Sequence, residues 1–187
     1  VVKSLPNACL HYAAEEFDIR GNNTLFTTNG VASSQALIAA ASSIKRGDST
    51  WALAGGFDSH KDEGEYYNFA QYGLMPNATD SDDKSNELGE GAGVLLLEAY
   101  EHANKRKAHI WGEILGYSET FLDVVGNSKE NIKKVENAVK ECVRSAGLDF
   151  NDIDLVSLDG TLEPNYKAIE TYILKKFFPN IETVNYK

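Results

Sequence analysis

The stretch Thr24–Gly47, TLFTTNGVASSQALIAAASSIKRG, passes from one hydrophobic pattern to another without a linker. Residues 24–28 are β-branched or apolar and predict a strand, and Asn29–Gly30 is a turn signal. Alanine and serine dominate residues 31–46 and predict a closely packed helix. A strand that breaks sharply into a helix exposes the side chain at the turn beside free N–H groups, so many acyl-transfer enzymes hold a nucleophile there. The residue at the tip of this turn is Gly30, which has no side chain.

The rest of the chain repeats this alternation of strands and helices. Further helices are expected over residues 5–17, 99–107, 128–146 and 165–177, and further strands over 49–59, 93–98, 110–118, 152–158 and from 182 onward. The strands at 49–59 and 152–158 are apolar enough to be buried. Strand–helix–strand order with short loops predicts an α/β protein with a parallel sheet covered by helices.

Composition excludes several classes of partner. The 187 residues carry a net charge of −10, which argues against nucleic acid and anionic membranes. No apolar run approaches the ~20 residues of a membrane span. Two cysteines, Cys9 and Cys142, lie among apolar neighbours and predict buried, reduced thiols in a cytoplasmic protein. Neither cysteine stands in metal-ligand spacing, and we expect neither a metal nor a cofactor.

Several separated motifs occur in an order that resembles one family. They are TLFTTNG, ALAGGFDS, ELGEGAGVLLLEAYEHANKRKAHIWGEILGY, LVSLDGTLEPNYKAIE and VNYK. This order resembles the β-ketoacyl synthases, the condensing enzymes of fatty-acid and polyketide synthesis. The resemblance implies a thiolase-like α/β fold with αβαβα layers, of which this chain is an incomplete middle segment. Residues 1–187 would then form a single ketosynthase-like segment, with the end of the N-terminal half at about 1–120 and the start of the C-terminal half at about 121–187.

The most specific motif is the glycine cluster Gly89–Gly93. It precedes a strand, whereas a dinucleotide-binding fingerprint follows a strand and opens a helix. We therefore interpret it as a tight, buried turn where backbones approach closely. The resemblance implies that Glu90, within it, is buried and hydrogen-bonded.

The resemblance also locates the family's catalytic positions, and none is intact in this chain. The nucleophilic cysteine of a ketosynthase belongs at the elbow, where this sequence reads Thr28–Asn29–Gly30. Covalent catalysis needs a thiolate or a hydroxyl at that point, so Gly30 cannot form an acyl-enzyme. Ser33 and Ser34 lie further along the helix and are interpreted as packing residues.

The first catalytic histidine of the family belongs to a His-Gly-Thr turn, which reads Asp159–Gly160–Thr161 in this chain. An ionised aspartate cannot donate a hydrogen bond, and it repels a malonyl carboxylate or a developing enolate. Lys187 matches the strand-ending lysine that precedes the second histidine.

These positions favour a catalytically impaired ketosynthase homologue, similar to inactive chain-length factors, that acts as the partner subunit of an active ketosynthase. Two alternatives stay open: a protein that binds an acyl chain or acyl thioester without turnover, and a weak enzyme that uses Asp159 as a base. Either a homodimer or a heterodimer with a ketosynthase is expected. An acidic acyl carrier protein is a further candidate partner. Lys45–Arg46 and Lys105–Lys107 are the compact basic stretches that it could contact, although both are better interpreted as solvated helix ends. Alone, the segment is expected to expose sheet edges and apolar faces.

Overall fold

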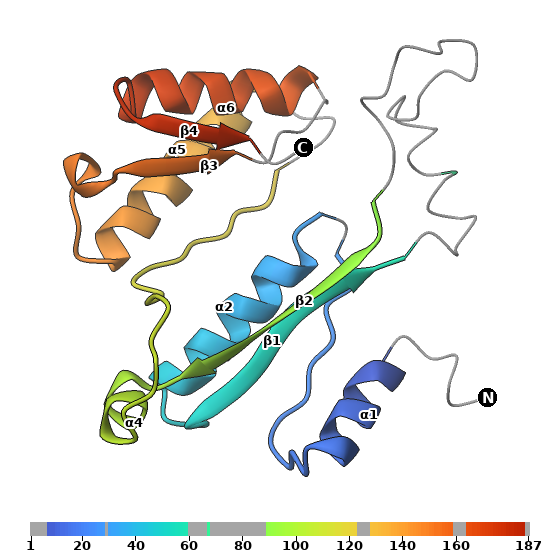
Figure 1. Ribbon diagram of the computed structural model, residues 1–187. Coiled ribbons are helices and arrows are strands. Elements are labelled where there is room, and N and C mark those ends of the chain that lie inside the picture. Colours follow the sequence, from blue (N-terminus) through green and yellow to red (C-terminus); the bar gives the residue numbers. More distant parts are fainter. Residues whose placement is uncertain are drawn as a thin grey trace. The chain divides into compact units, whose positions relative to one another are not determined.

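The computed structural model describes residues 7–28, 30–59, 67, 89–122, 128–158 and 164–185. Its elements belong to two compact units, which are described separately (Figure 1). Among the described residues, the first unit extends to Gly112 and the second begins at Glu113. The assignment of these two parts to the two halves of a ketosynthase stays a prediction.

The first unit is a two-stranded antiparallel sheet with one long helix packed along it. Its elements are α1 (Ala8–Glu16), α2 (Ala32–Lys45), β1 (Trp51–Asp58), β2 (Gly91–Glu98) and α4 (Tyr100–Lys105). Figure 1 shows α2 lying beside both strands. The helix packs closely because the Ser33 side chain occupies the space in which a Cβ on Gly56 would lie.

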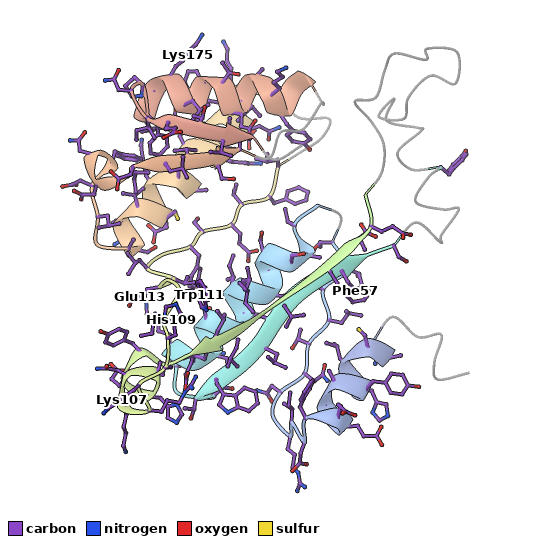
Figure 2. All side chains as sticks on the ribbon, viewed as in Figure 1. Phe57, Lys107, His109, Trp111, Glu113 and Lys175 are labelled. Carbon is purple, nitrogen blue, oxygen red and sulfur yellow. The ribbon has the colours of Figure 1, made fainter. Side chains whose placement is uncertain are left out.

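The other face of this sheet has no helix over it in the described part of the unit. Trp51 pairs with Glu98 and Asp58 with Gly91, so directly opposite residues share a face. The face away from α2 carries five large apolar side chains that are 41–65% exposed: Trp51, Leu53, Phe57, Val94 and Leu96. We call these five residues the open face; Figure 2 labels Phe57 among them.

The second unit is a strand–helix–strand crossover supported by a second helix. It contains α5 (Ser128–Ser145), the short 3-10 helix η2 (Phe150–Asp152), β3 (Leu155–Leu158), α6 (Pro164–Phe177) and β4 (Glu182–Asn185). β3 and β4 pair in parallel, with Leu158 opposite Asn185. The crossover helix α6 connects these two strands, as parallel pairing requires.

Apolar and polar contacts join α5 to α6. Val143 of α5 and Ile169 and Ile173 of α6 are buried, and the two helices contact each other. Near the surface, the Tyr172 hydroxyl donates to a Glu136 carboxylate oxygen at 2.9 Å, and the Lys176 ammonium donates to the same oxygen. These hydrogen bonds lower the pKa of Glu136, with Lys176 the larger cause.

Two strand predictions and one pairing prediction are wrong. Residues 22–28 and 108–122 have no secondary structure, although strands were expected at 24–28 and 110–118. Residues 49–59 do form a strand, but it pairs antiparallel with β2. A strand exists only where another strand completes its hydrogen bonds, and neither unpaired segment has one among the described residues.

Two predictions of burial are also wrong. The apolar strands are largely exposed, with Leu53 41% and Leu155 51% exposed, because one face of each two-stranded sheet carries no helix in the described structure. Cys9 is exposed as well, and Cys142 is partly exposed. Both cysteines are free thiols.

Candidate functional site

The elbow is a single tight turn that leads directly into α2. The Ala32 N–H donates to the Thr28 carbonyl oxygen at 3.2 Å, and the Thr28 hydroxyl donates to the side-chain oxygen of Gln35 in the second turn of the helix. Gly30 lies between these contacts with φ of +77°, as the sharp turn predicts. L-residues with side chains rarely adopt this conformation, whereas glycine does so readily.

The space around Gly30 is open. An ideal Cβ built on Gly30 meets no heavy atom within 4 Å. Packing in the described structure therefore leaves room for a side chain, and only the backbone conformation favours glycine. Ser33 does not replace the missing nucleophile, because its hydroxyl is directed at Gly56 of β1.

The remaining predicted positions flank described elements but lie outside the described residues. These are Asn29, Asp159, Gly160, Thr161 and Lys187. β3 ends at Leu158, immediately before Asp159, and β4 ends at Asn185, two residues before Lys187. Because β3 and β4 are parallel and Leu158 is opposite Asn185, the chain leaves both strands at the same edge of the sheet.

The glycine cluster differs from its prediction. Glu90 is exposed, not buried, since no described segment packs over residues 89–93. Gly89, Gly91 and Gly93 each have open space where a Cβ would lie. The close backbone approach occurs instead on the partner strand, where a Cβ on Gly55 would overlap the Gly93 carbonyl oxygen.

Sequence reasoning missed a charged cluster at the corner between β2 and α4. Arg106 donates two hydrogen bonds to the Glu98 carboxylate, with Nη2 2.7 Å from Oε2 and Nε 2.9 Å from Oε1. His102 Nδ1 is also hydrogen-bonded to Glu98 Oε1. These bonds, chiefly the one from Arg106 and then that from His102, lower the pKa of Glu98 to about 2. The spacing i, i+4, i+8 on a strand-to-helix corner was the signal available in the sequence.

This cluster holds the β2–α4 corner in place. The Glu98 side chain is only 10% exposed, although its two partners are about half exposed. His102 lies in α4 and Arg106 directly follows it, so their hydrogen bonds to Glu98 fix the direction in which the chain leaves β2. Both carboxylate oxygens are occupied by these contacts, so we interpret the cluster as structural.

Neither a metal-binding cluster nor a membrane-spanning helix is present within the described ranges. No group of three or more His, Cys, Asp or Glu side chains there could hold a metal ion. No helix in the same ranges is long and apolar enough to span a bilayer.

Residues 2–103 match the family description "Beta-ketoacyl synthase, N-terminal domain". The chain belongs to the β-ketoacyl synthase family. It is 30% identical over 182 residues to nodulation protein E of Rhizobium leguminosarum bv. trifolii, an alignment that covers 94% of this chain and 45% of that protein. The chain therefore spans about half the length of the curated relatives it matches.

Solved structures agree with this assignment to a thiolase-like ketosynthase fold. A β-ketoacyl synthase from Burkholderia phymatum STM815 is 25% identical, with a TM-score of 0.80 over 97% of this chain and 47% of that one. Two structures of lower identity share the fold. One is a type II polyketide synthase acyl-carrier protein in complex with its ketosynthase (20% identical, TM-score 0.74, 96% of this chain and 48% of that one). The other is the ishigamide ketosynthase/chain length factor (21% identical, TM-score 0.65, 90% of this chain and 43% of that one).

Proposed function

We propose that this protein is a catalytically impaired member of the β-ketoacyl synthase family that serves as the partner subunit of an active ketosynthase in fatty-acid or polyketide synthesis. The observation that carries the proposal is Gly30. It stands at the apex of an elbow with φ of +77° and with open space around it, but it has no atom that could take an acyl group.

The retained geometry supports a structural role. The turn is closed by the bond from Ala32 to Thr28 and by the Thr28–Gln35 side-chain contact, and α2 packs on β1 through Ser33 and Gly56. In sequence, Asp159 places an acid where the family has a histidine. A carboxylate there opposes both decarboxylation of a malonyl thioester and stabilisation of an oxyanion.

Co-purification tests the proposal. The tagged chain is co-expressed with the active β-ketoacyl synthase of the same organism, and the complex is then incubated with a radiolabelled acyl thioester. We expect both proteins in one complex, label on the partner's cysteine, and no label on this chain. Acylation of this chain, or carbon–carbon bond formation by this chain alone, contradicts the proposal.

A pair of cysteine variants tests whether the elbow could still present a nucleophile if it had one. Gly30→Cys places a thiol in the open space at the elbow, whereas Ser34→Cys places one a turn further along α2. Any acyl labelling of the native thiols Cys9 and Cys142 is the same in both variants. Acyl transfer to residue 30 alone would show that the elbow still presents a nucleophile correctly, and equal labelling of both variants would show that it does not.

Native mass spectrometry distinguishes the alternative of a non-catalytic acyl-binding protein. A co-purified lipid or acyl thioester on the chain alone, together with no affinity for a ketosynthase, would favour that alternative. An unliganded mass and a ketosynthase complex favour the partner subunit.

A further inference from the structure

Helices α1, α2, α4 and α5 end in the same kind of turn. In each turn, one residue has a left-handed backbone with φ between +49° and +78°, and the N–H of the next residue donates to a carbonyl oxygen five residues earlier at 2.9–3.2 Å. Glycine is favoured at the left-handed position because it has no Cβ. The residues at this position are Asp18, Gly47, Lys107 and Gly147. The turns after α1 and α4 therefore hold a side chain in a conformation that favours glycine.

Lys107 is the less expected of these two residues. Aspartate tolerates the left-handed region because its short side chain can hydrogen-bond locally, and Asp18 also pairs with Arg20 at 2.9 Å. The turn after α4 uses only the backbone of Lys107, whose N–H donates to the Asn104 carbonyl oxygen at 3.0 Å. The Lys107 side chain is exposed. Glycine would close the same turn with less strain, so the helix end does not explain the lysine side chain.

A nearly fully exposed tryptophan follows four residues later. Trp111 is 93% exposed, the highest value among the large apolar side chains of the described residues. Its ring meets the His109 ring in a T-shaped contact, with the ring centres 4.5 Å apart and an interplanar angle of 85°. This contact orients the indole and occupies at most one of its two faces. The other face is therefore available to stack on a ring from solution.

His109 and Trp111 act on the same side of the chain. Residues 108–112 have no secondary structure, and alternate residues of an extended chain point the same way, as the ring contact between these two shows. Lys107 precedes His109 by two residues, and its flexible four-carbon stem brings the ammonium group within reach of a ligand on the indole. Figure 2 labels all three residues on the segment that follows α4.

We propose that Lys107, His109 and Trp111 form a binding site for a small aromatic anion, a planar ring that carries a phosphate group. Trp111 stacks on the ring, His109 positions the indole, and Lys107 neutralises the phosphate. The inference goes beyond the proposed function and does not depend on it.

The charge of the chain limits the size of this ligand. A single phosphate meets the local cation, whereas a long polyanion or a broad anionic membrane would also meet the rest of a chain whose net charge is −10. The proposed ligand is therefore a small molecule, such as a mononucleotide or an aryl phosphate, and not a nucleic acid or a lipid surface.

Fluorine NMR of the chain labelled with 5-fluorotryptophan tests the inference. The chain has two tryptophans, Trp51 and Trp111, so it gives two signals, which Trp51→Phe assigns. We expect AMP to shift the Trp111 signal with a Kd of roughly 1 mM, as befits one stacked ring and one ion pair on an open surface, and to leave the Trp51 signal in place. Adenosine lacks the phosphate and should bind about three- to fivefold more weakly. Inorganic phosphate lacks the ring and should bind at least about fivefold more weakly.

Phenyl phosphate distinguishes the two sources of such a ligand. Tighter binding of AMP than of phenyl phosphate identifies a nucleotide site, and the reverse order identifies an aryl phosphate site. Either order supports a site for an aromatic anion.

Lys107→Gly separates binding from folding. It removes the cation and relieves the positive φ, so we expect a Kd for AMP about three- to fivefold higher together with a raised urea midpoint. Asp18→Gly makes the matched replacement at the end of α1 and should leave the Kd unchanged. A lysine with a purely structural role would change the urea midpoint alone.

Three results would overturn the inference. They are an unchanged Trp111 signal with both AMP and phenyl phosphate at about 10 mM, roughly ten times the expected Kd, equal Kd values for wild type and Lys107→Gly, and equal shifts of the Trp51 and Trp111 signals. Co-purification with an active ketosynthase is scored separately, because its loss in a chain that still binds AMP rejects the partner-subunit proposal alone.

Discussion

Gly30 combines a left-handed backbone conformation with the absence of a side chain at the elbow. Because a Cβ there has no neighbour within 4 Å, the cost of any side chain is set by the positive φ. We expect Gly30→Ala to lower the free energy of unfolding by about 1 kcal/mol, the usual cost of the left-handed region for an L-residue.

Gly21 supplies the control for this prediction. A Cβ on Gly21 also has open space, and its φ is not in the left-handed region. Gly21→Ala should therefore be neutral or slightly stabilising in urea unfolding. Equal effects of the two substitutions would show that the elbow conformation is not strained.

Glu98 makes the stability of the folded chain depend on pH. Its pKa is about 2 in the folded state against 4.5 without its partners, because Arg106 and His102 donate to the ionised form. A depressed folded pKa stabilises the protein above pH 4.5, and that contribution is lost as the pH falls towards 2. We expect wild type to be more stable than Glu98→Gln at neutral pH, with the difference shrinking over this range.

Urea midpoints measured at a series of pH values check the Glu98 prediction. Glu101→Gln removes an exposed carboxylate from the neighbouring helix α4, where no ion pair to it is seen among the described residues. Its midpoint should follow wild type throughout. A constant difference between wild type and Glu98→Gln from neutral to acid pH would mean that the cluster does not hold Glu98 ionised.

At the scale of elements, the contact between α2 and β1 depends on one glycine. The Ser33 side chain fills the position of a Cβ on Gly56, so Gly56→Ala forces the helix and strand apart. We expect a loss of about 1–3 kcal/mol in the free energy of unfolding, which is typical of an overpacked contact. Ser33→Gly should recover part of that loss in the double variant.

Gly93 is the matched control for Gly56. It lies directly opposite Gly56 in the β1–β2 register and has open space around its Cβ position. Gly93→Ala should be tolerated, and Ser33→Gly should not change its effect. Additive effects of Gly56→Ala and Ser33→Gly in a double-mutant cycle would contradict the proposed contact.

Local elements followed closely from sequence, but strand pairing did not. The helices at 32–45, 128–145 and 164–177 were predicted within one or two residues at each end, because apolar spacing and the glycine or proline at their ends are local signals. Apolar alternation at 110–118 indicates which side chains a strand would bury, but it does not show whether another strand is available to pair with it. That segment remains irregular, with Trp111 93% exposed.

At the scale of the whole chain, the open face is the dominant feature. Its five large apolar residues form one side of β1 and β2, and contiguous exposed apolar surface drives association. We expect this chain to self-associate when produced alone, and Leu96→Lys to reduce that association while retaining the far-UV circular dichroism spectrum. Size-exclusion chromatography with light scattering measures the change.

Leu97 distinguishes the two faces of the sheet. It is the next residue on β2, and its partner Ala52 belongs to the face packed by α2. We expect Leu97→Lys to lose the far-UV circular dichroism spectrum of the folded chain, because it places a charge against α2. If Leu96→Lys also unfolds the chain, or if it leaves association unchanged, the open face is not the surface responsible.

By itself, the sequence determined the main helices, the family and the residue at the elbow, because each depends on local spacing and residue type. Tertiary structure alone decided that β1 pairs antiparallel with β2, that Glu90 is exposed, and that Glu98 is held by Arg106 and His102. These features depend on which segments meet in space. Hydrogen bonds and ion pairs between segments cannot be predicted reliably from local patterns in one sequence.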